Sequence, residues 1–173
     1  VIWHYQGACG IIAHNCSFER AMLGDKLGPS KKTGQPPTWI CTYKCALRVW
    51  PEAPGHKNQE LRYFLGIDEL PDFVPDLAMP PHRAGPDAYV TAFILRELLA
   101  KAPLADLVKW SSGPALLAIC WLKKHRGTKW REVPPDYLSW IVNKSGMDDR
   151  DVLATARYYL KKHQSPPTGG QPT

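Results

Sequence analysis

The chain has 173 residues, of which 44% are hydrophobic, and a formal net charge of +6 at pH 7. This length suits one domain, or a smaller domain with an appendage. No apolar run reaches about 18 residues, which disfavours a membrane-spanning protein. Five cysteines at irregular spacing do not form a disulfide framework, and no export signal is evident, so we expect a protein of the reducing cytoplasm.

The positive charge is concentrated toward the C-terminus. Residues 1–100 hold ten Lys and Arg and ten Asp and Glu, whereas residues 101–173 hold 12 against six. A basic segment of this kind favours a polyanionic partner such as nucleic acid, although a solvated, lysine-rich surface is the commoner explanation.

The first half of the chain predicts short strands that lead into helices. An apolar run at residues 7–13 indicates a buried strand, and Ser17 can cap the helix that follows. Residues 39–42 indicate a second strand and residues 46–50 a second helix. This order is typical of α/β folds.

A proline-rich passage separates two further helices. Asn58 can cap a helix over residues 59–65. The passage then leads to His82, after which a long helix begins near Gly85 or Pro86. Its expected buried stripe contains Ala88, Ala92, Leu95, Leu99 and Ala102, widened by Thr91 and Leu98.

The basic C-terminal part carries four tryptophans: Trp110, Trp121, Trp130 and Trp140. We expect two short helices there, over residues 137–142 and 148–162. Residues 166–173 have no apolar anchor, and we expect them to be disordered.

One group of candidate functional residues lies at the start of the long helix. If His82 is in the preceding loop, its imidazole can fold toward Asp87, and this pair suits activation of water beside a metal-held phosphate. The simpler alternative is a surface histidine and an aspartate that favours the helix dipole.

A second group follows the first strand. His14 and Asn15 end that strand, Phe18 can stack on a base, and Glu19 can reach a divalent ion. The alternative is a capped helix with Phe18 in the core and Glu19 in solvent.

Both groups carry a family resemblance. IIAHNCSFERAML resembles the second motif, and PPHRAGPDAYVTAFIL the third, of the DnaQ-like 3′-to-5′ exonucleases, the DEDDh group with a ribonuclease H-like fold. WICTYKCALRVWPEAPGHKNQELRYFLG is similar to the intervening part of bacterial members. HRGTKWREVPPDYLSWIV and MDDRDVLATARYYL resemble the module appended to ExoX-like exonucleases. The likeness covers nearly all of residues 7–163.

The resemblance implies a role for each matched residue. In the family, four carboxylates hold two divalent ions, Mg²⁺ or Mn²⁺, and a histidine activates the attacking water. His82 would be this general base, Asp87 and Glu19 would be metal ligands, and Asn15, Phe18 and His14 would lie near the substrate.

Two departures from the family pattern matter. The family usually has aspartate at the position of Glu19, whose side chain is longer by one methylene. The first motif, Asp-x-Glu, does not occur in the sequence, and we expect it upstream of Val1. Two ions would otherwise have too few ligands, so we expect the chain by itself to have little or no exonuclease activity.

Weaker candidates are a zinc site and a basic surface. Cys41, Cys45 and His56 lack an evident fourth ligand, which disfavours zinc. The densest basic cluster could hold a DNA strand by charge and stacking, or it could be the solvated surface of a small module whose core contains the tryptophans. It comprises Lys123, Lys124, Arg126, Lys129, Trp130 and Arg131.

The sequence therefore predicts an α/β, ribonuclease H-like exonuclease domain at residues 1–104 that lacks its first strands, and a small, mainly helical, basic module at 105–165. The expected function is metal-dependent 3′-to-5′ hydrolysis of DNA, with single strands or 3′ ends as the partner and no membrane. The alternative is a non-catalytic nucleic-acid-binding or interaction protein derived from an exonuclease.

Overall fold

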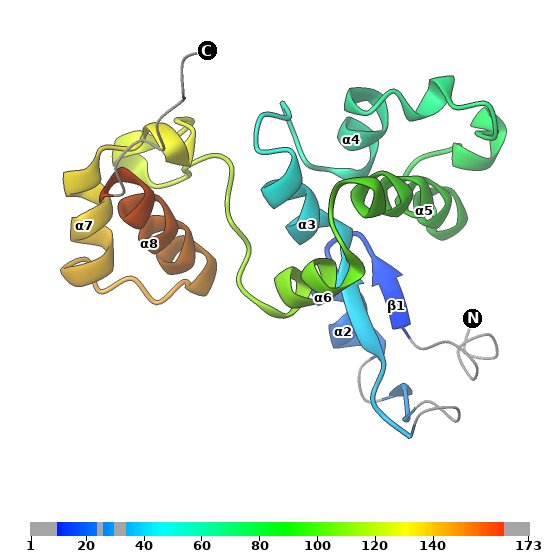
Figure 1. Ribbon diagram of the computed structural model, residues 1–173, viewed down its shortest axis with the longest axis horizontal. Helices are drawn as coiled ribbons and strands as arrows, with labels where there is room; N and C mark the ends of the chain where they lie inside the picture. Colours follow the sequence, from blue (N-terminus) through cyan, green and yellow to red (C-terminus); the bar gives the residue numbers. More distant parts are fainter. Residues whose placement is uncertain (1–9, 24–25, 30–33, 165–173) are drawn as a thin grey trace, which may run out of the picture. The chain divides into compact units, whose positions relative to one another are not determined.

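The computed structural model describes residues 10–23, 26–29 and 34–164, and the chain forms two compact units that divide between Gly113 and Pro114 (Figure 1). The predicted disordered tail at 166–173 and the first residues of the predicted strand at 7–13 lie outside the described residues. No helix in the described ranges is both long and apolar enough to cross a bilayer.

The first unit is a mixed α/β structure with a small parallel sheet. Strands β1 and β2 pair from Gly10 opposite Thr38 to Ala13 opposite Cys41. The elements in chain order are β1 (Gly10–Ala13), α2 (Ser17–Leu23), β2 (Thr38–Cys41), α3 (Thr42–Val49), α4 (Asn58–Phe64), η2 (Ile67–Glu69), η3 (Pro75–Ala78), α5 (Ala84–Lys101) and α6 (Leu104–Ser112). The predicted strand-to-helix order is confirmed.

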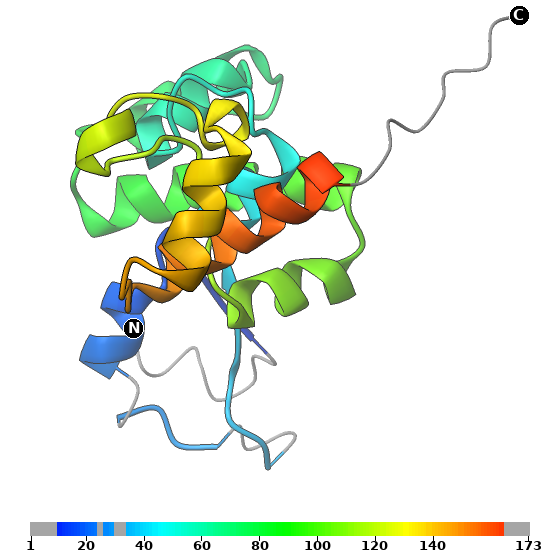
Figure 2. The ribbon, with the colours of Figure 1, turned by 90° about the vertical axis from the view of Figure 1, so that its left-hand side faces the viewer.

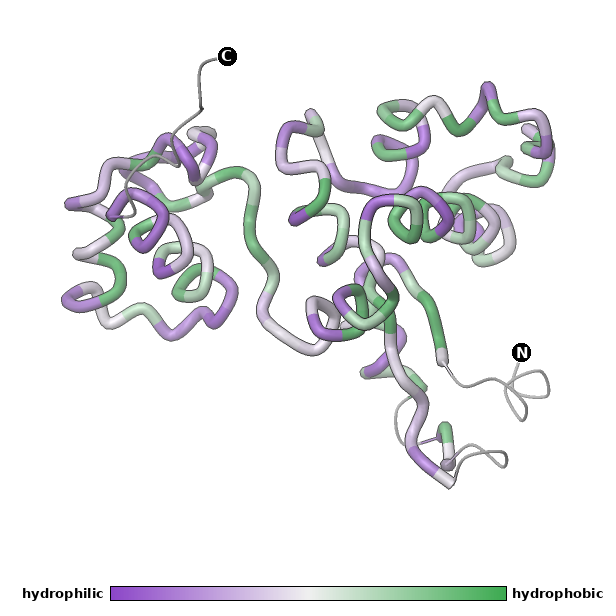
Figure 3. Tube along the Cα trace, viewed as in Figure 1, coloured by the Kyte–Doolittle hydropathy of each residue, from purple (hydrophilic) through white to green (hydrophobic). Residues whose placement is uncertain are grey.

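The predicted stripe of α5 is confirmed at Thr91, Leu98 and, just after the helix, Ala102, and it is wrong at other positions. Ala88 and Ala92 are exposed and Leu99 is exposed at 46%, whereas the residues that α5 buries are Val90, Thr91, Phe93, Ile94 and Leu98. Both sets have helical spacing, but the second contains the larger side chains, which fill the space against α3 and α4. Along α5, hydrophobic and hydrophilic segments alternate (Figure 3).

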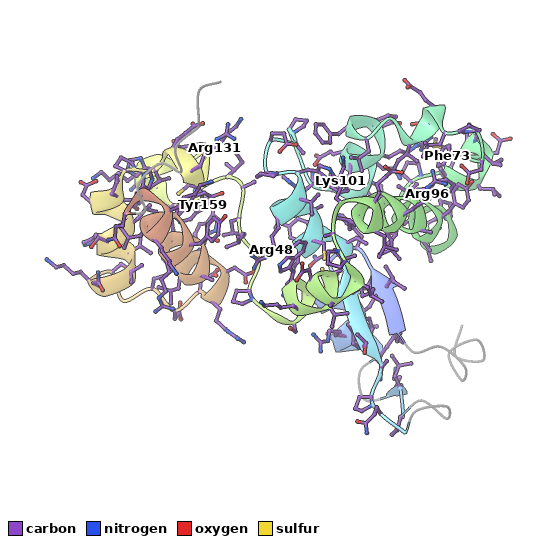
Figure 4. All side chains as sticks on the ribbon, viewed as in Figure 1. Arg48, Phe73, Arg96, Lys101, Arg131 and Tyr159 are labelled. Carbon is purple, nitrogen blue, oxygen red and sulfur yellow. The ribbon has the colours of Figure 1, made fainter. Side chains whose placement is uncertain are left out.

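The loop before His82 is held against α5 by aromatic and polar contacts. The ring centroid of Phe73 lies 5.1 Å from that of Phe93, and the Tyr89 hydroxyl accepts a hydrogen bond from the backbone N–H of Val74 at 2.8 Å. Arg96, labelled with Phe73 in Figure 4, forms an exposed ion pair with Asp72. These contacts position the chain that leads into residues 82–87, the α5 junction, where the loop meets the start of α5.

The boundary between the units lies later than the predicted one at residue 104. Helix α6, which the sequence did not predict, contacts β2 and α3. Leu107 is fully buried in the core of the first unit, and the Ser111 hydroxyl accepts a hydrogen bond from the backbone N–H of Cys41 at 2.7 Å. Helix α6 therefore belongs to the first unit, although it lies in the basic part of the sequence.

The second unit is small and helical, as predicted. Its elements are η4 (Lys123–His125), η5 (Trp130–Glu132), α7 (Pro135–Asn143) and α8 (Arg150–Gln164). Helix α7 packs beside α8 in both views (Figures 1 and 2). The core centres on Trp130, with Leu138 and Ile141 from α7 and Val152 from α8.

Candidate functional site

The end of β1 is fixed by His14. Its Nδ1 lies 2.9 Å from the Thr42 hydroxyl, and its Nε2 donates to the His56 carbonyl at 2.8 Å. Burial lowers the pKa of His14, so the ring is neutral at pH 7. Because both ring nitrogens have partners within the unit, His14 positions the strand end, and it would have to break these bonds to reach a substrate.

Asn15 turns the chain out of the strand. Its φ of 66° is left-handed, a conformation that asparagine adopts more readily than most residues. Its side-chain oxygen accepts a hydrogen bond from the Ser17 hydroxyl at 2.9 Å. Ser17 is the first residue of α2, and the Asn15 side chain that it contacts is exposed.

Phe18 and Glu19 lie in the first turn of α2. The Phe18 ring is 68% exposed, which excludes the alternative that it packs in the core and leaves the ring accessible for stacking. Oε2 of Glu19 is buried and has no hydrogen-bond partner among the described residues. A buried carboxylate oxygen without a partner is costly, and this cost would fall if a ligand met that oxygen.

The predicted pair at the start of α5 is brought together through the main chain. His82 has a left-handed φ of 64°, and its backbone N–H donates to Asp87 Oδ1 at 3.4 Å. His82 lies in the loop before the helix, as predicted, and is exposed. The hydrogen bond that joins His82 to Asp87 thus comes from the backbone N–H, which the left-handed turn points toward the carboxylate.

Asn58 ties the α5 junction to α4. Its amide donates to the Asp87 carbonyl at 3.2 Å and to the Thr91 hydroxyl at 2.9 Å. The predicted cap position is corrected by one residue: Lys57 is the N-cap of α4, and its backbone N–H donates to Glu60 at 3.0 Å. Asn58 is therefore free of the capping role and anchors the first turn of α5.

The two junctions are neighbours within the first unit. Helix α5 contacts β1, and the Asp87 carboxylate is among the charges that act on the pKa of His14, which it raises against the larger effect of burial. The α2 and α5 junctions thus flank the end of β1.

The carboxylates in this region do not complete a two-ion site. In the described ranges, no three His, Cys, Asp or Glu side chains are grouped so that they could hold a metal ion. Glu19 and Asp87 supply only part of the donor set that two divalent ions need. The suggested zinc ligands have other partners: His56 Nε2 donates to the Trp50 carbonyl at 2.9 Å, and Cys45 contacts the Leu107 carbonyl.

Cys16 and Cys41 lie together beside this region, and the sequence did not predict that they are neighbours. The interaction with Cys16 and the backbone N–H of Lys44 lower the pKa of Cys41, against the opposing effect of burial. The pKa of Cys16 is raised by its interaction with Cys41 and by burial. The parallel pairing of Ala13 with Cys41 brings the two cysteines together, and no local spacing in the sequence could reveal it.

The predicted basic cluster of the second unit divides into exposed and buried members. Lys123, Lys124 and Arg126 are exposed and Lys129 is half-buried, whereas Trp130 is fully buried. Arg131 is exposed and lies 3.4 Å from Glu132. Trp130 therefore cannot stack on a base while the core is intact, and the alternative that it is a core residue holds.

A pocket adjoins the two lysines. Its volume is about 640 Å³, and it is lined by Lys123, Lys124, Asp136, Tyr137 and Trp140. Tyr137 and Trp140 are three residues apart on α7, which places them on one face of the helix. The sequence prediction did not single out this pair, although its three-residue spacing within a predicted helix is visible in the sequence.

Comparisons with known proteins support the resemblance, although no family model matches the chain. The chain is 29% identical to exodeoxyribonuclease 10 of Escherichia coli K12 over 173 aligned residues, which cover 93% of this chain and 69% of that protein. Exodeoxyribonuclease 10 of E. coli O6:H1 matches equally. The predicted resemblance to ExoX-like exonucleases is therefore confirmed.

One solved structure is also similar. Exonuclease X in complex with 5′ overhanging duplex DNA matches with a TM-score of 0.48 and 29% identity, over 64% of this chain. The chain spans 60% of the length of that solved chain.

Proposed function

We propose that this chain, a relative of the ExoX-like exonucleases by sequence, contributes part of a metal-dependent 3′-to-5′ exonuclease that hydrolyses DNA and acts in the cytoplasm. The observation that carries the proposal is the α5 junction. There the exposed His82 is held in a left-handed turn by its backbone hydrogen bond to Asp87. A strained, exposed histidine beside a half-buried carboxylate suits activation of water at a phosphodiester.

The residues around β1 take complementary roles in this proposal. His82 is the general base, and Asp87 and Glu19 are ligands of Mg²⁺ or Mn²⁺. Oε2 of Glu19 is buried and has no hydrogen-bond partner among the described residues, which supports the assignment of Glu19 as a metal ligand. Asn15 and the exposed ring of Phe18 contact the DNA, whereas His14 acts through the strand end that it positions. The divalent ions would polarise the phosphodiester and lower the pKa of bound water.

The chain by itself is weakly active or inactive in this proposal. Glu19 and Asp87 are two carboxylates, and the sequence has no Asp-x-Glu to add the other two. This shortage also favours a second candidate function: a non-catalytic protein that binds nucleic acid. Gel shifts across a salt series test that candidate, since salt-sensitive binding without metal-dependent cleavage would support it.

The role of His82 can be tested in a chimaera that carries the Asp-x-Glu strand of exodeoxyribonuclease 10 ahead of this chain. With Mg²⁺ and a 5′-labelled single strand, His82→Ala should reduce the rate of nucleotide release by about 100- to 10,000-fold, as expected for loss of a general base. His163→Ala, which removes another exposed histidine at the end of α8, is the matched control and should keep the full rate. Full activity of His82→Ala would exclude His82 as the base.

A further inference from the structure

We propose that the second unit binds single-stranded DNA in the pocket beside α7, with one base stacked on Trp140 and the adjoining phosphates on Lys123 and Lys124. The pocket is built from residues of the second unit. The inference rests on DNA as the partner in the proposed function, but it does not depend on hydrolysis.

The pocket has the size and lining of a nucleotide site. Its volume of about 640 Å³ lies within the range of about 300–1,000 Å³ that small-ligand sites occupy. Two cations, one carboxylate and two aromatic rings line it. A phosphate needs the cations and a base needs a flat ring, and this pocket offers both within one short stretch of surface.

The aromatic rings form a rigid platform. Tyr137 and Trp140 stack with their centroids 5.4 Å apart and their planes 17° apart. The Tyr137 ring also contacts the ring of His125, with the two centroids 4.5 Å apart. Two neighbouring rings therefore fix the orientation of Tyr137. Trp140 is nevertheless 46% exposed. A partly exposed indole that is already held in place loses little conformational entropy when a base stacks on it.

The charged side chains of the pocket determine where the phosphates bind. Nζ of Lys124 lies 5.2 Å from the centroid of the Tyr137 ring, and Lys123 precedes it in η4. Within the described part of the chain, neither lysine forms an ion pair with a carboxylate, so both charges can neutralise phosphates. Asp136 also lines the pocket, and its negative charge repels phosphate. The base, which is uncharged, can occupy the part of the pocket next to Asp136.

The surroundings favour a strand over a free nucleotide or a duplex. Residues 114–173, which form the second unit, carry ten basic against five acidic side chains, and Arg126 extends the exposed positive surface beyond the pocket. A polyanion gains from this wider charge, whereas a mononucleotide does not. Stacking on Trp140 also requires an unpaired base face, which a duplex does not offer.

The test measures binding of fluorescein-labelled (dT)₈ to the full chain by fluorescence anisotropy. The buffer contains EDTA so that metal-dependent cleavage cannot occur. Trp140→Ala should weaken binding at least about fivefold, the lower end of what a base–aromatic stack contributes. Lys123→Ala/Lys124→Ala should reduce the slope of log affinity against log salt by about 1.4, since each phosphate contact on a single strand accounts for about 0.7.

Matched variants separate binding from folding. Trp121→Ala removes a tryptophan of the same unit that is 51% exposed and outside the pocket lining, and it should bind like the wild type. Lys144→Ala/Lys162→Ala removes the same charge from exposed positions elsewhere in the unit and should leave most of the slope intact. Trp140→Phe keeps a ring and should recover most of the affinity.

Three outcomes would overturn the inference. The first is that Trp140→Ala binds (dT)₈ as tightly as the wild type does. The second is that dTMP at an equal nucleotide concentration displaces (dT)₈, and the third is that a blunt duplex binds as tightly as (dT)₈. The two proposals fail separately. A chimaera that binds (dT)₈ through Trp140 but releases no nucleotides defeats the proposed exonuclease activity only. A chimaera that cleaves DNA while Trp140→Ala leaves binding unchanged defeats the pocket only.

Discussion

In the first unit, the proposed catalytic side chains come from two junctions near opposite ends of the unit's sequence, whereas the aromatic platform of the second unit comes from one turn of α7. The two junctions that carry Glu19 and His82 are connected in space through the packing of α5 on β1. Tyr137 and Trp140 are neighbours by helical spacing. A catalytic site of the first kind depends on long-range packing and on every contributing strand, while a binding surface of the second kind needs one folded helix.

Loss of the second unit's core is the largest change in stability that we expect. Trp130→Ala removes a fully buried ring and should lower the free energy of unfolding of that unit by about 3–5 kcal/mol. Urea unfolding followed by circular dichroism measures it. Trp140→Ala, a partly exposed position on the same unit, should cost less than about 1 kcal/mol. Equal costs at both positions would contradict the separation of core and binding tryptophans.

A smaller loss is expected when the loop before His82 is loosened. Arg62 is almost fully buried, donates Nε to both carboxylate oxygens of Asp68 at 3.0 and 3.1 Å, and reaches Met79 in the loop. Arg62→Met leaves Asp68 without its cation and should cost about 1–3 kcal/mol, discounted because Asp68 is partly exposed.

The same substitution tests whether the two sites are independent. Arg62→Met should reduce nucleotide release by the chimaera, since the His82 loop loses its anchor, and should leave (dT)₈ binding by the second unit unchanged. Parallel activity and anisotropy measurements on one preparation compare the two. A loss of (dT)₈ binding equal to the loss of activity would contradict independent sites.

The smallest effect concerns the pH dependence of the first unit. Burial lowers the pKa of both His14 and His56 from the ordinary value of 6.5. Below pH 6.5, the unfolded chain therefore binds protons that the folded unit does not, and stability falls as pH falls. The slope is at most about 1.4 kcal/mol per pH unit for each histidine. Urea unfolding at pH 7.5, 6.5 and 5.5 should show this decline, and His14→Gln should make it shallower; an unchanged slope would contradict the account.

Local patterns in the sequence predicted the order of elements and the position of His82, but not which face of α5 is buried. Ala88, Ala92 and Leu99 lie at helical spacing, and so do Val90, Ile94 and Leu98. Which of the two sets is buried depends on how α3 and α4 pack against the helix. Helix α6 was not predicted for a related reason. The basic charge of its segment indicated that the segment belonged to the C-terminal module, whereas its packing partners lie in the first unit.

The candidate sites were predictable to different degrees. The left-handed turn at His82 and the orphaned oxygen of Glu19 depend on backbone conformation and tertiary burial, which composition does not reveal. In the second unit, the basic residues were found, but Trp130 and Trp140 could not be ranked by sequence, since either could have formed the core. Burial of Trp130 and exposure of Trp140 decide between them.

The proposed function assigns the general base to His82 and two metal ligands to Glu19 and Asp87, and the sequence contains no Asp-x-Glu that could add the other two carboxylates. The most direct measurement is shortening of a 5′-labelled single strand in Mg²⁺ by the chain alone and by the chimaera with the Asp-x-Glu strand. We expect no metal-dependent shortening by the chain alone and stepwise shortening from the 3′ end by the chimaera. Equal cleavage by both, or a folded chimaera that never shortens the strand, would contradict this account.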